Sequence, residues 1–267
     1  MKLIQITDIH LRQNGELVSG RDPFISLQAA RDDILRRHSD ADLIVITGDL
    51  ADDGSAGSYA LLRETMAPLR TPLALLLGNH DNRERFLQVF PERRGEGGFV
   101  HGMHEVSNGR ALFLDTLDEG AHGGRLCSKR LSWFEAQLAA GDGPYWVFMH
   151  HNPVPSHLAL LDRIMLQDRE AFWAIIARYR ERIAHIFHGH LHLPMSGALH
   201  GVPVSCVRGT AHAGFPNYGE DRLLPHSDLP ESYAVIISDG PATTVMMVEY
   251  GLHVSQPQPQ PLRSAAS

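Results

Sequence analysis

Short apolar runs alternate with longer amphipathic stretches through the first two-thirds of this 267-residue chain. Six runs have the length and composition of buried strands, namely Leu3–Thr7, Leu43–Thr47, Leu73–Leu77, Ala111–Asp115, Trp146–Met149 and Ile183–Phe187. Four stretches between them carry apolar residues at helical spacing, namely Pro23–His38, Ser58–Pro68, Ser128–Ala139 and Asp168–Tyr179. Strands that alternate with helices predict βαβ units, and therefore a mostly parallel sheet with helices packed against it.

The last third of the chain has a different pattern, in which turn residues separate short β-rich runs. These runs are Met195–Leu199, Val202–Val207, Tyr233–Ser238 and Thr243–Tyr250. We expect them to form a second, more antiparallel sheet in the same domain. Residues 209–231 are expected to form an ordered loop over the functional site or a subunit contact, with a mobile linker as the alternative. The domain is predicted to span residues 1–253, and the low-complexity tail 254–267 to be disordered.

Composition is typical of a globular domain, because 43% of the residues are hydrophobic and 21% are charged. The formal net charge of −7 argues against a stable nucleic-acid partner, which usually requires a basic face. Neither a membrane span of about 18 apolar residues nor a signal peptide is expected, since a strand already begins near residue 2. The two cysteines, Cys127 and Cys206, form no CxxC pattern, so we expect a reducing, cytoplasmic environment.

Residues of the types that bind metals follow five of the predicted strands, at the point where each strand ends. They are Asp8-Ile9-His10, Gly48-Asp49, Gly78-Asn79-His80-Asp81, His150-His151 and His188-Gly189-His190. In open α/β sheets, ligands bind beyond the carboxyl ends of the strands, so these groups can converge on one point. One such motif alone would carry little weight, whereas five in order at strand ends predict a shared site.

The residue types fit a site for two divalent or trivalent cations. Mixed Asp, His and Asn ligation suits Fe, Mn, Zn or Co better than metals that prefer thiolates. Two divalent ions carry about +4, and Asp8 and Asp49 offset only part of this charge, so a phosphate anion would be attracted. The neutral side chain of Asn79 avoids cancelling more of it. Two ions roughly 3.5–4 Å apart can share a bridging hydroxide that attacks phosphorus in line.

The ordered set D-x-H, G-D, G-N-H-D, H and G-H-x-H resembles the signature of the calcineurin-like metallophosphoesterases. The resemblance extends from Asp8 to about Tyr250. It implies an α/β fold that is a four-layer αββα sandwich of two mixed β-sheets flanked by helices, with a dinuclear metal site at the strand carboxyl ends. By this resemblance, the first ion is bound by Asp8, His10 and His190, the second by Asn79, His150 and His188, and Asp49 bridges both.

The same resemblance implies roles for residues around the ions. His80 would contact the phosphate or assist the leaving group, and Asp81 would orient His80. The segment around Leu161–Ile164 looks like bacterial class III cyclic-nucleotide phosphodiesterases. The segments His10–Gly20 and Gly209–His212 look like bacterial glycerophosphodiesterases, which implies that His212 either lies on the substrate side or supports a metal ligand. Two residues are left with two interpretations each: Arg12 meets a substrate phosphate or pairs with a carboxylate, and His192 lines the pocket or is structural.

The expected reaction is hydrolysis of a small phosphodiester, foremost a 3′,5′-cyclic nucleotide or a glycerophosphodiester. Asn79 and His80 would bind the phosphate oxygens, and a protonated His80 could donate its proton to the departing alkoxide. The alternatives are a phosphomonoesterase or protein phosphatase with the same site and, less favoured, a non-catalytic metal-binding scaffold. The resemblance also favours a homodimer or higher homo-oligomer, and no membrane partner is expected.

Overall fold

Two mixed β-sheets lie at the centre of the computed structural model, which describes residues 1–13, 15–218 and 225–251. The first sheet contains β1 (Lys2–Ile6), β2 (Leu43–Thr47), β3 (Leu73–Leu76), β12 (Ser232–Ser238) and β13 (Thr243–Glu249), in the order β13-β12-β1-β2-β3. The second contains β4 (Gly102–Val106), β5 (Gly109–Phe113), β6 (Tyr145–Phe148), β7 (Ile183–His188), β8 (Met195–Leu199) and β9 (Val202–Cys206), in the order β4-β5-β6-β7-β9-β8. The central strands of each sheet run parallel, and the antiparallel strands lie toward the edges.

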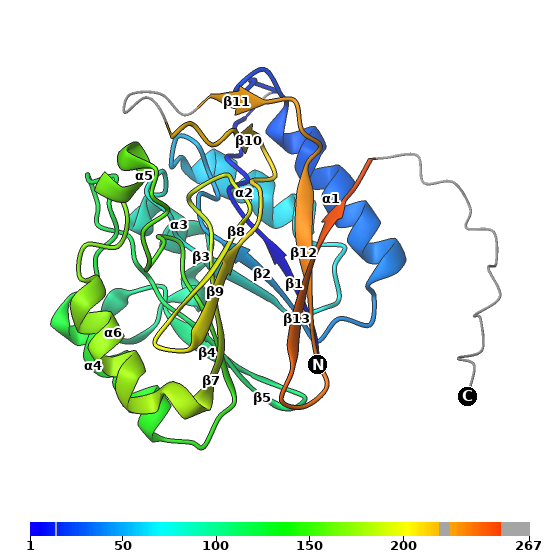
Figure 1. Cartoon of the computed structure of the whole chain (residues 1–267). Coiled ribbons are helices and arrows are strands. Elements are labelled where there is room, and N and C mark those ends of the chain that lie inside the picture. Colours follow the sequence, from blue (N-terminus) through cyan, green and yellow to red (C-terminus); the bar gives the residue numbers. More distant parts are fainter. Residues whose placement is uncertain (14, 219–224, 252–267) are drawn as a thin grey trace, which may run out of the picture.

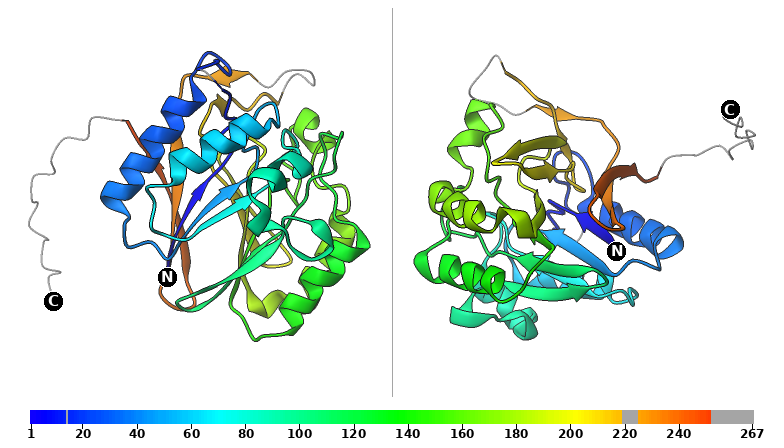
Figure 2. Two further views of the ribbon diagram at one scale, coloured as in Figure 1. Left: turned by 180° about the vertical axis from the view of Figure 1, so that it is seen from behind. Right: turned by 60° about the horizontal axis from the view of Figure 1, so that its bottom comes forward.

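Helices cover the outer face of each sheet, as Figures 1 and 2 show. The first sheet is covered by α1 (Pro23–Arg37), α2 (Ala56–Met66) and α3 (Arg83–Val89), and the second by α4 (Ser128–Ala139) and α6 (Arg169–Tyr179). The remaining short elements are α5 (Ala159–Arg163), three 3₁₀ turns (Pro91–Arg93, Glu96–Gly98 and Arg180–Arg182) and the two-stranded ribbon of β10 (Ala213–Gly214) and β11 (His226–Ser227). This arrangement confirms the predicted αββα sandwich. No helix within the described residues has the length and apolar character required to cross a membrane.

Alternating side chains of the central strands face two different hydrophobic layers. Ile4 and Ile44 pack against the helices of the first sheet. Leu3 and Val45 point the other way and meet Phe148 of the second sheet. Because both faces of these strands are buried, their sequences are continuous apolar runs without polar alternation.

Side-chain caps fix where two helices begin. The Asp22 carboxylate accepts a hydrogen bond of 2.9 Å from Phe24 N at the start of α1, where Pro23 takes the first helical position. Asn82 caps α3 by accepting a hydrogen bond of 2.9 Å from Arg85 N. This second cap also sets the end of the loop that carries Asn79 and His80.

The C-terminal strands do not form a sheet of their own, so that expectation was wrong. β12 pairs antiparallel with β1, with Leu3 opposite Ile236, and extends the first sheet. β9 pairs parallel with β7, with Phe187 opposite Ser205, and extends the second sheet. Turn residues predict each hairpin locally, but the sheet that receives it is decided by contacts between residues far apart in sequence. The predicted disordered tail, 254–267, lies outside the described residues, as do 219–224 within the predicted loop 209–231.

We predict that Phe148→Ala lowers the free energy of unfolding by about 3–5 kcal/mol, because it leaves a cavity between the sheets. Phe148 is completely buried there and stacks on Phe187 at a centroid distance of 4.9 Å. The control is Met247→Ala on β13, where the side chain is 39% exposed and the change should stay within about 0.5 kcal/mol. Urea denaturation measures both values, and equal losses would contradict the packing of the two sheets.

Candidate metal centre

The loops that follow β1, β2, β3, β6 and β7 meet at one end of the two sheets. Within the first sheet, His10 N donates to Asp49 O at 2.8 Å. Within the second sheet, Gly189 N donates to His150 O at 3.0 Å. His190 N then donates to the carboxylate of Asp8 at 3.0 Å and so connects the loops of the two sheets.

Five residues in these loops have a left-handed backbone, although none of them is glycine. Their φ angles are 52° at Asp8, 41° at His10, 48° at Asp49, 72° at His190 and 55° at His192. This conformation is uncommon for residues with a side chain. Such strain concentrates at functional sites, where the surrounding structure maintains it. The strained backbone positions therefore lie in the same loops as the predicted metal ligands.

Asp8, His10, Asp49 and His192 form the first ligand cluster. Their candidate ligand atoms lie within 4.8 Å of one another, and all four residues are buried. His10 Nε2 is 3.5 Å from Asp49 Oδ2, and His192 Nε2 is 3.6 Å from Asp8 Oδ1. The two Nε2 atoms are 3.2 Å apart. Two carboxylates and two imidazoles that converge in this way are a fitting set for a transition-metal cation.

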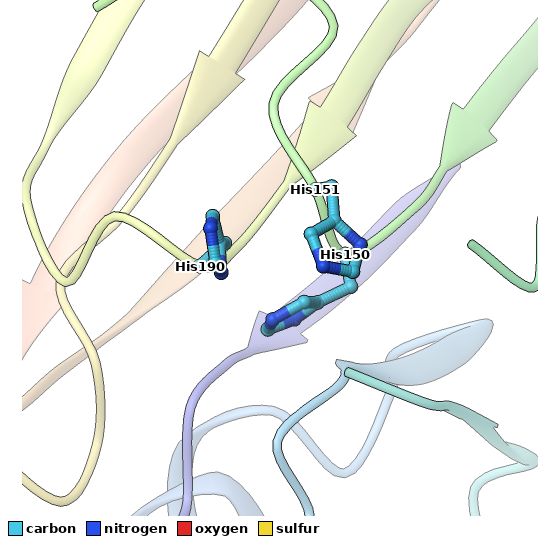
Figure 3. A group of neighbouring side chains, drawn as sticks. All are labelled: His150, His151 and His190. Carbon is cyan, nitrogen blue, oxygen red and sulfur yellow. The ribbon is translucent and has the colours of Figure 1, made fainter. Parts of the chain in front are cut away.

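Asn79, His150 and His190 form a second cluster on the other side of Asp49. His150 Nε2 is 3.4 Å from Asp49 Oδ2 and 3.2 Å from Asn79 Oδ1. The His190 ring lies 5.1 Å from the His150 ring, across from it on the loop after β7 (Figure 3). Among the described residues, the buried His190 Nε2 has no hydrogen-bond partner. Asp49, a member of the first cluster, thus also contacts the second, which is the arrangement that a bridging ligand would have.

Three of the imidazoles are oriented by hydrogen bonds to their Nδ1 atoms. The pairs are His10 Nδ1 with Asp52 Oδ1 at 3.1 Å, His150 Nδ1 with Thr47 O at 2.8 Å, and His192 Nδ1 with His212 O at 3.3 Å. A partner of this kind fixes the ring and leaves Nε2 available to a metal. The residues present therefore fit two cations.

The electrostatics of the two clusters also suit cation binding. Burial lowers the pKa of His192 to about 4 and that of His190 well below its usual value, so both rings are neutral near pH 7. Neutral imidazole is the form that binds metals. Although burial opposes both shifts, His150 holds the pKa of Asp49 well below its usual range, and Asp49 raises the pKa of His150 to about 9. A bound cation would take over the charge compensation that this proton provides.

His188 lies outside both clusters, in contrast to its predicted ligand role. It is the last residue of β7, and its Nδ1 is 2.9 Å from Gly189 O. Because the strand runs through His188, the loop that approaches Asp8 begins only at Gly189. A Cβ atom on Gly189 would lie 2.0 Å from Thr7 Oγ1, so this close approach requires glycine. The structure brings together His190 and His192, two residues further along than the predicted pair.

His151, although it adjoins the second cluster, has both ring nitrogens engaged. Its Nδ1 is 2.8 Å from Thr116 Oγ1, and its Nε2 is 3.2 Å from His122 O. We therefore place His151 as a support for the His150 loop.

His80 lies at the open side of the centre, with 38% of its side chain exposed. Its backbone N donates to Asp49 Oδ1 at 2.9 Å, and its ring meets the His10 ring edge-on at 4.7 Å. The ring Nδ1 is 3.1 Å from Asp52 O. His80 thus lies where a ligand that enters from solvent could contact its ring, and its predicted role stays a prediction.

Asp81 does not contact the His80 ring, so the expected orienting role is corrected. Its carboxylate accepts hydrogen bonds from Leu50 N at 3.0 Å, Ala51 N at 3.1 Å, Gly78 N at 2.8 Å and the Tyr59 hydroxyl at 3.0 Å. Burial, with the nearby charge of Asp49, raises the pKa of Asp81 to about 7. Asp81 therefore holds the loop after β2 against the loop after β3.

Asp52 occupies the position that sequence reasoning gave to Asp81. Besides its contact with His10, its Oδ1 lies 3.6 Å from His80 Nδ1. Although burial opposes the shift, hydrogen bonds from His10 and Arg12 lower the pKa of Asp52 to about 2. The feature of the sequence that could have identified Asp52 is its position, a carboxylate three residues after Asp49.

Arg12 is committed to carboxylates, which agrees with the second of its two interpretations. Its Nε donates to Asp52 Oδ2 at 2.6 Å, and its Nη1 donates to Glu16 Oε2 at 3.0 Å. His212 does reach the centre, since its ring stacks on His192 at 4.0 Å and lies 5.4 Å from the His10 ring.

Comparisons with known proteins give several relatives that are similar in sequence over most of the chain. A probable cyclic nucleotide phosphodiesterase of Rhodopseudomonas palustris is 38% identical over 239 residues, which cover 88% of this chain and 87% of the relative. The 3′,5′-cyclic adenosine monophosphate phosphodiesterase CpdA of Vibrio vulnificus is 32% identical, over 79% of this chain and 76% of the relative. The glycerophosphodiester phosphodiesterase GpdQ of Enterobacter lignolyticus is 32% identical, over 72% and 71%.

The fold likewise has solved counterparts. A dimetal phosphatase from Danio rerio aligns with a TM-score of 0.67 at 13% identity, over 94% of this chain and 99% of that one. The family model for calcineurin-like phosphoesterases matches residues 1–194, which include every residue of the two ligand clusters. The chain belongs to the calcineurin-like phosphoesterase family.

Proposed function

We propose that this chain is a metal-dependent phosphodiesterase that hydrolyses small phosphodiesters, foremost 3′,5′-cyclic nucleotides and secondly glycerophosphodiesters. The observation that carries the proposal is the pair of ligand clusters that share Asp49 beside the exposed ring of His80. The preference for diesters is supported by the names of the relatives, which are cyclic nucleotide and glycerophosphodiester phosphodiesterases. A phosphomonoesterase or protein phosphatase is the second candidate, and a non-catalytic scaffold is the least favoured.

In this proposal each cluster holds one ion. Asp8, His10, Asp49 and His192 would hold the first, and Asp49, Asn79, His150 and His190 would hold the second. Oxygen and imidazole donors suit Fe, Mn, Zn or Co. When bound, two such ions supply Lewis acidity, which activates water as the nucleophile and offsets charge on the phosphoryl group.

The chain's own residues orient the substrate and move a proton. Asn79 and His80 are placed to bind the non-bridging phosphate oxygens. The hydrogen bond from His80 N to Asp49 Oδ1 fixes the backbone of His80, and the contact of Nδ1 with Asp52 O fixes its ring. Nε2 is then the atom that donates a proton to the departing alkoxide.

Metal content tests the ligand assignment. We predict that His190→Ala and His192→Ala each bind about one ion fewer per chain than the wild type, because each removes an Nε2 ligand. His188→Ala is the matched control and should keep the wild-type content. Mass spectrometry of the metals after dialysis measures all three variants. Loss of an ion in His188→Ala and His190→Ala, with wild-type content in His192→Ala, would restore the assignment made from the sequence.

Hydrolysis of bis-p-nitrophenyl phosphate and of p-nitrophenyl phosphate tests the reaction. With added Mn²⁺ we expect faster cleavage of the diester, and a chelator should abolish it. His80→Ala should lower kcat by about 100-fold or more, because it removes the proposed proton donor. Asn79→Ala should also lose activity, whereas His200→Ala, an exposed histidine in the turn between β8 and β9, should not. Preference for the monoester would support the phosphatase alternative.

Asp52→Asn tests whether this carboxylate positions His10. The amide oxygen of Asn accepts a hydrogen bond from His10 Nδ1 less strongly than a carboxylate does, and the amide carries no charge. We therefore predict about 10- to 100-fold weaker binding of the first ion. Glu16→Gln, which removes only the outer partner of Arg12, should leave the affinity unchanged. Titration of the metal-free protein with Mn²⁺ gives both affinities. Equal affinities in the two variants would show that Asp52 has no positioning role.

The compartment and the assembly of the chain are further parts of the proposal. Cys127 and Cys206 are both free thiols, which supports a reducing and therefore cytoplasmic environment. A homodimer or higher homo-oligomer remains a prediction that light scattering of the purified chain would test.

A further inference from the structure

A column of imidazoles leads from the first ligand cluster to the protein surface. His212 stacks on His192 at 4.0 Å, with an angle of 20° between the rings. His226 meets the outer side of His212 edge-on, at a centroid distance of 4.7 Å. His226 is exposed, so the column joins the candidate metal centre to solvent in two ring contacts.

The backbone fixes His226 relative to the metal centre. Gly214 N, in β10, donates to His192 O at 2.9 Å, so the ribbon is bonded to a residue of the first cluster. In the β10–β11 pairing, Gly214 lies opposite His226. Figure 1 shows this ribbon at the top of the molecule, next to the segment that precedes α1. The position of His226 thus follows from main-chain contacts and does not depend on its side chain.

Ser19 completes this outer position from a segment far away in sequence. Its Oγ lies 3.4 Å from His226 Nε2. The turn that carries Ser19 is closed by hydrogen bonds between Val18 and Arg21. Arg21 in turn donates to Leu229 O at 2.9 Å, which ties the turn to the chain after β11. Ser19 has a left-handed φ of 50°, the same kind of local strain as in the ligand loops.

We propose that Ser19 and His226 form an outer subsite that binds the nucleoside portion of the phosphodiester. The inference rests on the proposed function. When the phosphate lies at the metal centre, the organic group of a cyclic nucleotide extends away from the centre. The column of imidazoles extends from the centre in one such direction, so an organic group that follows the column contacts protein there. A hydroxyl and an imidazole provide both donors and acceptors for sugar hydroxyls or base edges. Inorganic phosphate has no organic group and does not reach this subsite.

Steady-state kinetics with 3′,5′-cyclic AMP test the subsite in His226→Ala and Ser19→Gly. Glycine tolerates the left-handed φ at position 19, so this variant removes the hydroxyl without adding strain. Loss of one hydrogen bond should raise KM about three- to tenfold, with kcat changed less than about twofold. The inhibition constant of AMP should rise by a similar factor, while that of inorganic phosphate and the metal content stay at wild-type values. His200→Ala is the matched control, because His200 is also exposed and left-handed, with a φ of 53°.

Three results would overturn the proposal. Wild-type KM for cyclic AMP in both variants would show that neither side chain meets the substrate. Parallel changes in phosphate inhibition and metal content would show that the variants disturb the metal centre itself. A raised KM for glycerophosphoethanolamine without one for cyclic AMP would assign the subsite to a glycerol headgroup. Absence of any diesterase activity in the wild type would instead refute the proposed function, and the subsite with it.

Discussion

The carboxylate of Asp49 is the group on which the rest of the centre depends. Its Oδ2 lies 3.5 Å from His10 Nε2 on the first sheet and 3.4 Å from His150 Nε2 on the second. Its other oxygen, Oδ1, accepts from the backbone of His80. A Cβ atom on Gly78 would lie 2.2 Å from Asp49 Oδ1, so the loop after β3 can approach Asp49 this closely only with glycine at position 78. One buried carboxylate therefore gathers loops from both sheets, which is possible only because the sheets pack face to face.

The elements around this centre could be predicted where the signal is local. The run Leu43–Thr47 is an exact match to β2, and Ser128–Ala139 is an exact match to α4. Burial on both faces makes such a strand apolar throughout, and a periodic apolar stripe marks the helix. The sheet that each C-terminal hairpin joins could not be predicted in this way. The pairing of Leu3 with Ile236 depends on packing between the two ends of the chain.

The site could be predicted as a set of loops, but its side-chain roles could not all be assigned. The sequence H-G-H-L-H allows two pairs of histidines at the same spacing, and only the end of β7 decides between them. The carboxylate adjacent to His80 in sequence, Asp81, turns toward backbone amides, while Asp52 reaches the ring from another loop. Proximity in sequence is a poor guide here, because the Asp81 carboxylate accepts hydrogen bonds from the backbone of Leu50, Ala51 and Gly78 and not from the neighbouring ring.

Anomalous X-ray diffraction from crystals of the full chain grown with Mn²⁺ is the most direct test of the central claim. The account predicts two anomalous peaks on either side of Asp49, one among Asp8, His10 and His192 and the other among Asn79, His150 and His190. A single peak, or a peak whose ligand is His188, would contradict it.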